Sequence, residues 1–233
     1  VELSNLQRQI LFDSSQLSQP KTIAAQQRIE AINPFIQVQN YNYQLDASNA
    51  QSLIEPYDII IDGSDNYATH YLINDTCVKL RKPFIAAAVH RFTGQLFTYA
   101  PQRGPCYRCL FPIAPNTGNC ETNGVISVLP GILGTLQATE AIKLITGIGT
   151  PLFGRLLTYD VLDMRFDEYQ FTSQENCSAC AINSLRDSST YPAMNLLTYP
   201  SINSLSDLPL NEIRSTTMSA TSLITVTELQ ALL

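Results

Sequence analysis

The chain has 233 residues, 45% of them hydrophobic and 15% charged, a composition that supports a buried core and argues against extensive disorder. Its net charge is -6 and its Lys and Arg residues do not cluster, which argues against a nucleic-acid partner. No apolar run reaches the roughly 18 residues that a membrane-spanning helix needs.

The start of the chain has the pattern of a structural element rather than of a targeting segment. Val1–Leu3 reads as the end of a strand, and the first residues lack the basic segment and apolar core of a signal peptide. The chain begins without Met and ends abruptly at Leu233, so we expect it to be a piece of a longer protein.

The first helix is predicted to begin at Pro20–Lys21 and to end at Asn33–Pro34. Proline is tolerated at the first helical position and disfavours helix at the residue before it. Lys21 then lies in the first turn, where free backbone N–H groups favour an anion. A cation there is mildly unfavourable for the helix unless it faces a phosphate. The polar stretch Ser4–Gln9 precedes this helix and has the composition of a solvated turn.

Alternating strands and helices follow. The expected strands are Ile36–Tyr43, Tyr57–Asp62 and Pro83–Val89, and the expected helices are Asp46–Ile54 and Tyr67–Lys82. Two of the strands are continuous apolar runs, which is typical of strands buried on both faces of a parallel sheet. The pattern predicts a doubly wound α/β fold with a mostly parallel sheet.

Polar residues directly follow the strand that ends at Asp62. In doubly wound sheets, ligands bind beyond the carboxyl ends of the strands. Asp65 and Asn66 are therefore candidate ligand residues, whereas Asp62 can simply end the strand. His70 lacks a His or carboxylate companion at metal-binding spacing, so we interpret it as incidental.

The second half of the chain predicts antiparallel additions to the sheet. Arg91–Tyr99 is predicted to form a turn and a strand with no long helix before it. A hairpin is predicted from Leu156–Tyr159 and Met164–Phe171. Between them a loop covers Leu110–Gly124, and a long helix covers Ile126–Ile148, kinked or started at its proline.

Two Cys-x-x-Cys pairs, Cys106 with Cys109 and Cys177 with Cys180, can together supply four thiolates to one tetrahedral zinc. The alternative is two unrelated structural or redox pairs. A redox pair should open a helix after a strand, and the second pair follows a hairpin. Short paired spacing also indicates a reducing, cytoplasmic location rather than secreted disulfides.

Arg108, inside the first pair, could face a partner protein or only solvent.

After the second pair the composition changes. The segment from 181 to 221 is rich in Ser, Asn, Thr and Pro and is predicted to be a linker. Residues 222–233 read as a short strand and a capped helix start, consistent with the opening of another domain.

Several motifs in this order carry a resemblance: Ser4-Asn5-Leu6-Gln7-Arg8-Gln9, Gln19-Pro20-Lys21, Asp62-Gly63-Ser64-Asp65-Asn66 and the two cysteine pairs. Together they resemble the adenylyltransferases of the ubiquitin-activating superfamily. The resemblance covers residues 1–180 and is closest to the sulfur-carrier adenylyltransferases of the molybdopterin and thiamine pathways. It implies a Rossmann-like domain that binds MgATP and holds Zn²⁺. Residues 222–233 resemble the opening of a rhodanese-like sulfurtransferase domain.

The resemblance implies a reaction and its partners. The C-terminal Gly-Gly tail of a ubiquitin-like sulfur carrier attacks the α-phosphate of ATP, pyrophosphate leaves, and an acyl-adenylate remains for a sulfur donor such as a cysteine desulfurase or a rhodanese. Catalysis of this kind depends mostly on positioning and charge neutralisation. Relatives are homodimers, which implies a homodimer here as well.

The same resemblance assigns roles to individual residues. Arg8 and Lys21 would neutralise the triphosphate, and Asn5 and Gln9 would hydrogen-bond phosphate or ribose. Asp65 would hold Mg²⁺ through its hard oxygens. Asn66 would orient that carboxylate or cap the following helix.

Cys120 lies in the predicted loop before Gly124. It is either an ordinary loop thiol or a nucleophile or sulfur-relay cysteine, because relatives have a cysteine at this place. A following helix N-terminus would lower its pKa and favour the second role.

One feature of the family is missing from the sequence. The family has a glycine-rich loop after its first strand and an acidic ribose-binding residue at the end of its second, and neither occurs here. The chain either begins late in an active enzyme or belongs to a non-catalytic scaffold that binds the carrier. A nicotinamide-dependent oxidoreductase is a third interpretation, but it leaves Arg8, Lys21 and the cysteine pairs unexplained.

Overall fold

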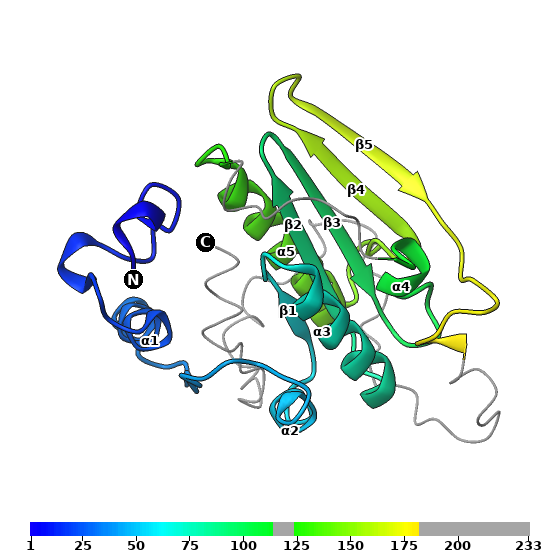
Figure 1. Ribbon diagram of the computed structural model, residues 1–233, viewed down its shortest axis with the longest axis horizontal. Coiled ribbons are helices and arrows are strands. Elements are labelled where there is room, and N and C mark those ends of the chain that lie inside the picture. The colour runs from blue at the N-terminus through cyan, green and yellow to red at the C-terminus, as the bar shows by residue number, and fades with distance from the viewer. Residues whose placement is uncertain (114–123, 182–233) are drawn as a thin grey trace, which may run out of the picture.

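The computed structural model describes residues 1–113 and 124–181. These residues form a five-stranded sheet with helices packed on it (Figure 1). The sheet consists, in spatial order, of β1 (Ile60–Asp62), β2 (Phe84–His90), β3 (Thr93–Tyr99), β4 (Arg155–Asp160) and β5 (Arg165–Gln170). The helices are η1 (Leu3–Asn5), η2 (Ser14–Gln16), α1 (Lys21–Ile32), α2 (Ala50–Ile54), α3 (Tyr67–Leu80), α4 (Tyr107–Leu110) and α5 (Leu129–Thr146).

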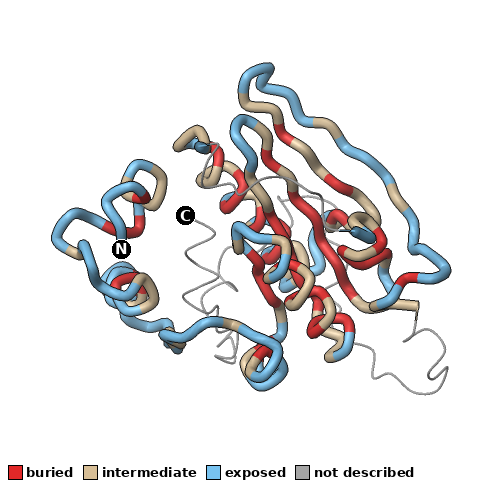
Figure 2. Tube along the Cα trace, viewed as in Figure 1, coloured by how far each residue is buried: buried red, intermediate tan, exposed pale blue. Residues whose placement is uncertain are grey.

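The sheet separates two hydrophobic clusters, because successive strand residues point to opposite faces. Phe84 and Phe97 belong to one cluster, which includes residues of α3 and the paired cysteines. Ile85 and Leu96 belong to the other, which includes residues of α5. Figure 2 shows that buried positions concentrate along β1, β2 and β3, whereas β5 is largely exposed. The α/β class predicted from the sequence is confirmed.

The mostly parallel sheet is not what the described residues form. β1 and β2 are parallel, but β2–β3, β3–β4 and β4–β5 are antiparallel. The turn from β2 to β3 is too short for the crossover that a parallel neighbour requires. The predicted antiparallel additions are therefore confirmed, and they make up most of this mixed sheet.

Two predicted strands are wrong. Residues 36–43 are extended but belong to no strand of the described sheet, and Val1–Leu3 leads into the short helix η1. Alternation along residues 36–43 reflects two separate burials: Val38 packs against a small N-terminal cluster and Tyr41 against the cluster of α3. The alternation of apolar residues therefore occurs in this segment although it pairs with no strand of the described sheet.

The predicted helices are confirmed with shorter ends. α1 begins at Lys21 as expected, and α5 has Pro130 in its first turn. α2 begins later than predicted because Asp46 accepts hydrogen bonds from the backbone N–H groups of Ser48 and Asn49, which hold a turn before the helix. None of the helices in the described ranges is long and apolar enough to cross a membrane.

The N-terminal segment has its own small core. Leu11, Phe12, Ala24 and Ile29 pack together, and this cluster shares no buried residue with the two clusters of the sheet. In Figure 1 this segment lies beyond β1, the edge strand of the described sheet. The predicted linker and the predicted second domain lie outside the described residues from position 182 onward.

Candidate functional site

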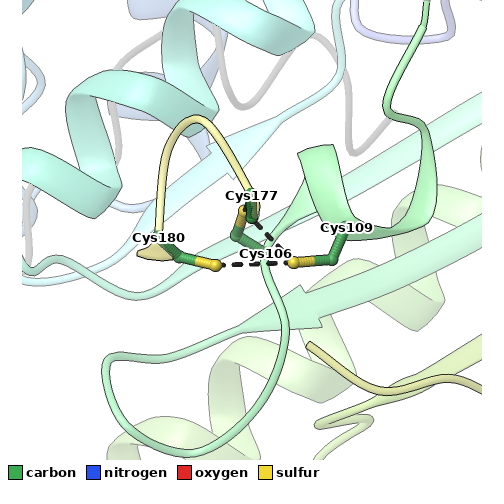
Figure 3. Close-up of side chains that lie close together, drawn as sticks. All are labelled: Cys106, Cys109, Cys177 and Cys180. Carbon is green, nitrogen blue, oxygen red and sulfur yellow. Dashed lines mark hydrogen bonds between the residues drawn. The ribbon is translucent and has the colours of Figure 1, made fainter. Parts of the chain in front are cut away.

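The four paired cysteines come together. Cys106 and Cys109 lie at α4, the next helix after β3, and Cys177 and Cys180 follow β5 (Figure 3). All four Sγ atoms lie within 4.8 Å of one another, and the sequence-distant pairs Cys106–Cys177 and Cys109–Cys180 are 3.5 and 3.4 Å apart. The predicted set of four thiols is therefore one cluster that could hold a metal ion.

The thiols of this cluster differ in acidity. Burial alone would raise the pKa of Cys177, but the backbone N–H groups of Cys180 and Ala179 and the neighbouring thiols outweigh burial and lower that pKa to about 7. Burial and the other cysteines raise the pKa of Cys106, and burial with the thiols of Cys109 and Cys177 raises the pKa of Cys180 to about 12. Cys177 is thus the first of these three thiols to become a metal-binding thiolate.

The first cysteine pair is fastened to α3. Asn74, which is fully buried, accepts a hydrogen bond of 2.8 Å from the backbone N–H of Tyr107. Arg108 forms two bonds with the carboxylate of Asp75. Arg108 is therefore part of a contact between the cysteine cluster and α3, which neither interpretation from the sequence anticipated.

The turn after β1 presents Asp65 to solvent. Its carboxylate is exposed, and Nδ2 of Asn66 lies 3.5 Å from its Oδ1. The side chain of Asn66 accepts a hydrogen bond of 2.9 Å from the backbone N–H of Thr69 and so caps α3. The capping role proposed for Asn66 from the sequence is confirmed, and the cap fixes where α3 begins after the turn.

His70 is not incidental. Its Nδ1 lies 2.7 Å from Oδ2 of Asp62, and both side chains are almost fully buried. The pair was not predicted from the sequence, because one carboxylate and one imidazole do not have the spacing of a metal site. The signal that could have found it is the position of Asp62 at the end of a buried strand, with His70 one turn into the following helix.

Asn5 and Arg8 lie together in the N-terminal segment. Asn5 is buried, and its Oδ1 accepts a hydrogen bond of 2.6 Å from Nη2 of Arg8. Arg8 also donates to the backbone carbonyl of Ser4. These contacts hold the guanidinium side chain at the surface of the segment, where it stays partly exposed.

Gln9 and Lys21 have polar atoms that are not paired with the described residues. Oε1 of Gln9 is buried and finds no hydrogen-bond partner there, and the same holds for Oγ1 of Thr22, the neighbour of Lys21. Lys21 is the first residue of α1, and within residues 1–113 and 124–181 its ammonium group has no ion-pair partner. The segment thus offers unsatisfied donors and acceptors beside two cations.

Arg8 lines a cavity of about 540 Å³ between the N-terminal segment and α5. Its other lining residues are Gln7, Ile10, Ser127, Val128, Gly131, Ile132, Thr135 and Leu136. The cavity is large enough for a small molecule.

Not all of the predicted site residues meet. Asn5 pairs with Arg8, Asp65 neighbours Asn66, and the cysteines cluster. Across the described ranges, no hydrogen bond or ion pair joins the N-terminal segment to the turn that carries Asp65. Cys120 lies outside the described residues, so its predicted role stays a prediction.

Comparison with known proteins identifies relatives over the same residues. A family model described as the ThiF family matches residues 1–179. A sulfur carrier protein adenylyltransferase of Thermus thermophilus is 42% identical over 188 residues, which are 77% of this chain and 69% of that protein. The SAMP-activating enzyme E1 of Haloferax volcanii is 40% identical over 193 residues, 80% of this chain and 71% of that protein.

Longer relatives and solved structures match in part. The adenylyltransferase and sulfurtransferase MOCS3 of Xenopus laevis is 40% identical over 185 residues, which are 78% of this chain but 41% of that protein. The crystal structure of E. coli MccB with ATP superposes with a TM-score of 0.67 at 20% identity, covering 77% of this chain and 56% of MccB. At that identity the likeness establishes the fold alone. The chain thus spans only part of each of these proteins.

Proposed function

The chain belongs to the ThiF family, and from this premise we propose that it activates a ubiquitin-like sulfur-carrier protein by adenylylating the carrier's C-terminal glycine with ATP. The carrier's carboxylate attacks the α-phosphate, the bond to the β-phosphate breaks, and pyrophosphate leaves. The observation that carries the proposal is identity of 40–42% to a sulfur carrier protein adenylyltransferase, a SAMP-activating enzyme E1 and an adenylyltransferase and sulfurtransferase, over more than three quarters of the chain.

The N-terminal segment supplies the groups for the nucleotide. In this proposal Arg8 and Lys21 neutralise the charge that develops on the leaving pyrophosphate. The position of Lys21 at the N-terminus of α1, which itself favours anions, supports its role. Asn5 fixes the Arg8 guanidinium. Oε1 of Gln9 is buried without a partner among the described residues, and because such an acceptor is costly this supports a hydrogen bond to a ribose hydroxyl.

The turn after β1 supplies the magnesium ligand. Asp65 has an exposed carboxylate without an ion-pair partner in the described ranges, and Asn66 holds the start of α3 directly beside it. Carboxylate oxygens are preferred Mg²⁺ ligands, and a bound Mg²⁺ would shield the phosphate charges. Arg8, Lys21 and Asp65 are thereby assigned as the residues on which the transfer step depends.

The cysteine cluster fits structural zinc. Four sulfurs at the usual Zn–S distance from a central ion in a tetrahedron lie roughly 3.8 Å apart. The separations of 3.4, 3.5 and 4.0 Å between neighbouring cysteines bracket that value. Four thiolates leave no open position, so the role of Zn²⁺ there is to join α4 to the segment after β5.

The remaining assignments follow from the family. We expect a homodimer, a sulfur donor such as a cysteine desulfurase or a rhodanese, and a carrier of the molybdopterin or thiamine type. Cys120 is proposed as the cysteine that contacts the carrier after activation, and residues 222–233 as the opening of a rhodanese-like domain. Alkylation of Cys120, with Cys120→Ser as the control, tests its role separately from adenylylation.

The test of the proposal is ATP–pyrophosphate exchange by the full-length protein, with and without a carrier that ends in Gly-Gly. We expect exchange that requires the carrier and falls at least about a hundredfold in Arg8→Ala, Lys21→Ala and Asp65→Ala. Arg28→Ala, an exposed cation of the same segment, should exchange normally. If folded, metal-loaded protein does not exchange with several carriers, the chain is a scaffold that binds the carrier without activating it.

A further inference from the structure

A buried carboxylate–imidazole pair lies beneath the turn that carries Asp65. Asp62 is 1% and His70 is 3% exposed, and their side chains meet at 2.7 Å. Asp62 ends β1 and His70 lies one helical turn into α3, so the pair joins the two elements on either side of the loop that carries Asp65. The proposed function assigns no role to either side chain.

The pair organises the main chain of the turn. Oδ1 of Asp62 accepts hydrogen bonds from both the backbone N–H and the hydroxyl of Ser64, at 2.9 and 2.7 Å. On the other side, Nε2 of Gln137 in α5 donates to the backbone carbonyl of Asp62 at 2.8 Å. The carboxylate of Asp62 is thus the centre of bonds that hold Ser64, the residue just before Asp65.

His70 is itself fixed by aromatic contacts. Its ring lies 5.5 Å from the ring of Tyr107, which sits between the first two cysteines, and 6.2 Å from the ring of Tyr67. The imidazole therefore cannot swing away from Asp62 without displacing packed neighbours. Nδ1 also lies 3.3 Å from the hydroxyl of Ser64, which places three polar groups in one contact.

The pair of Asp62 and His70 is better explained by its effect on the path of the backbone than by a contribution to stability. A buried charged or polar pair is often no more stabilising than apolar residues of similar volume. Asp62, Ser64 and His70 are joined by hydrogen bonds, while Oε1 of Gln137 has no partner among the described residues. Buried hydrogen bonds of this kind nevertheless specify one arrangement of the backbone around them. The arrangement that this network specifies is the path of residues 62–66.

We propose that His70 is a positioning residue for the nucleotide-bound magnesium: by holding Asp62, it fixes the turn through Ser64 and so sets where the carboxylate of Asp65 is presented. This inference rests on the proposed function in assigning Mg²⁺ to Asp65. It adds a residue that does not touch the nucleotide but determines the precision of the site, because a ligand misplaced by about 1 Å loses much of its effect.

Three variants of the full-length protein separate positioning from stability. His70→Leu fills the space but removes the donor, whereas His70→Asn keeps an amide N–H near the place of Nδ1. Thr98→Val is the matched control, because it removes a buried hydrogen bond of 2.8 Å to Glu140 and leaves the turn untouched. The unfolding midpoint of each variant reports the loss of stability.

Two readouts decide the proposal. Hydrogen exchange at the Ser64 amide reports the bond to Asp62, and calorimetric titration with ATP at varied Mg²⁺ reports the site. In His70→Leu we expect amide exchange faster by about tenfold or more, and a Mg²⁺ concentration for half-maximal ATP binding raised about tenfold. His70→Asn should restore both values to within about threefold. Thr98→Val should change neither, although it lowers the unfolding midpoint.

The proposal is overturned if His70→Leu alters ATP binding no more than Thr98→Val does. It is also overturned if the turn loosens while the Mg²⁺ dependence stays that of the wild type. A wild-type protein that binds MgATP without exchanging pyrophosphate contradicts the proposed function alone, and the His70 comparison is still decided by binding. Absence of Mg²⁺-dependent ATP binding in the wild type contradicts both.

Discussion

Arg108 of the first cysteine pair and Asp75 of α3 are joined by two hydrogen bonds, Nε to Oδ1 at 2.6 Å and Nη2 to Oδ2 at 2.7 Å. The guanidinium also lies 4.4 Å from the centre of the Tyr71 ring. Asp75 raises the pKa of Arg108 further above its usual value. The contact ties the cysteine cluster to the helix that begins directly after the turn carrying Asp65.

Removing the contact between Arg108 and Asp75 should lower the free energy of unfolding by a small but measurable amount. Arg108 and Asp75 are 26% and 43% exposed, so solvent screens their attraction. We expect Arg108→Ala to lower the free energy of unfolding by about 0.5–1 kcal/mol, less at high salt, as measured in urea. Arg165→Ala removes the more exposed pair with Asp167 and should cost less. If both variants lose the same free energy of unfolding, the two hydrogen bonds between Arg108 and Asp75 contribute no more stability than an exposed ion pair.

Loss of one cluster cysteine should abolish metal binding. In Cys106→Ser the four-ligand set is incomplete, and because metal binding is coupled to folding we expect a lower unfolding midpoint together with loss of bound zinc. Elemental analysis and thermal unfolding measure the two effects. Ser178→Ala, an exposed change inside the second pair, should retain both. A zinc content that is unchanged in Cys106→Ser would contradict the assignment of this cluster.

The metal-free protein should titrate one unusual thiol. Because the folded-state pKa of Cys177 is lowered to about 7, its thiolate favours the folded state. This contribution is fully present above the ordinary thiol pKa and is lost as the pH falls through about 7. We expect a step in thiolate ultraviolet absorbance near pH 7 that disappears in Cys177→Ser. If that variant keeps the step, another thiol is responsible.

Two glycines should respond to alanine in opposite directions. A Cβ at Gly94 of β3 would lie 2.3 Å from Cδ2 and 2.9 Å from Cγ of Leu133, so α5 could not stay packed against the strand. We expect Gly94→Ala to destabilise the protein by about 1–3 kcal/mol. A Cβ at Gly131 of α5 would meet no atom of the described residues within 4 Å, so Gly131→Ala should stabilise the helix by up to about 1 kcal/mol. Urea unfolding tests both, and equal effects would contradict the packing described.

Local patterns predicted much of this fold. Three local patterns each predict one element that the structure contains. They are the buried run ending at Asp62, which predicts a strand, the proline before Lys21, which predicts a helix start, and the short turn after β2, which predicts an antiparallel pair. The predicted strand at residues 36–43 failed because alternation records which side chains are buried and not what they are buried against. Strand pairing is a long-range property that this segment's own residues do not encode.

The same limit applies to the site. The Cys-x-x-Cys spacing specifies a ligand set by itself, so the cluster could be predicted. The pair Asp75–Arg108 could not, because its two segments are far apart in the sequence and meet only through packing on the sheet. The pair Asp62–His70 has a local signal, a carboxylate at the end of a buried strand and an imidazole in the next helix, but that signal does not specify the contact. Sequence proximity of Asn5 to Arg8 was visible, but their mutual hydrogen bond was not.

The most direct test of the central claim asks which phosphate of ATP becomes attached to the carrier. The full-length protein is incubated with a Gly-Gly-ended sulfur carrier and ATP labelled on the α- or the γ-phosphate, and the carrier is analysed by mass and by label. Our account predicts α-label on the carrier's C-terminal carboxylate, release of pyrophosphate, and loss of labelling in Asp65→Ala. A carrier that stays unlabelled, or that takes up γ-label with release of ADP, would contradict it.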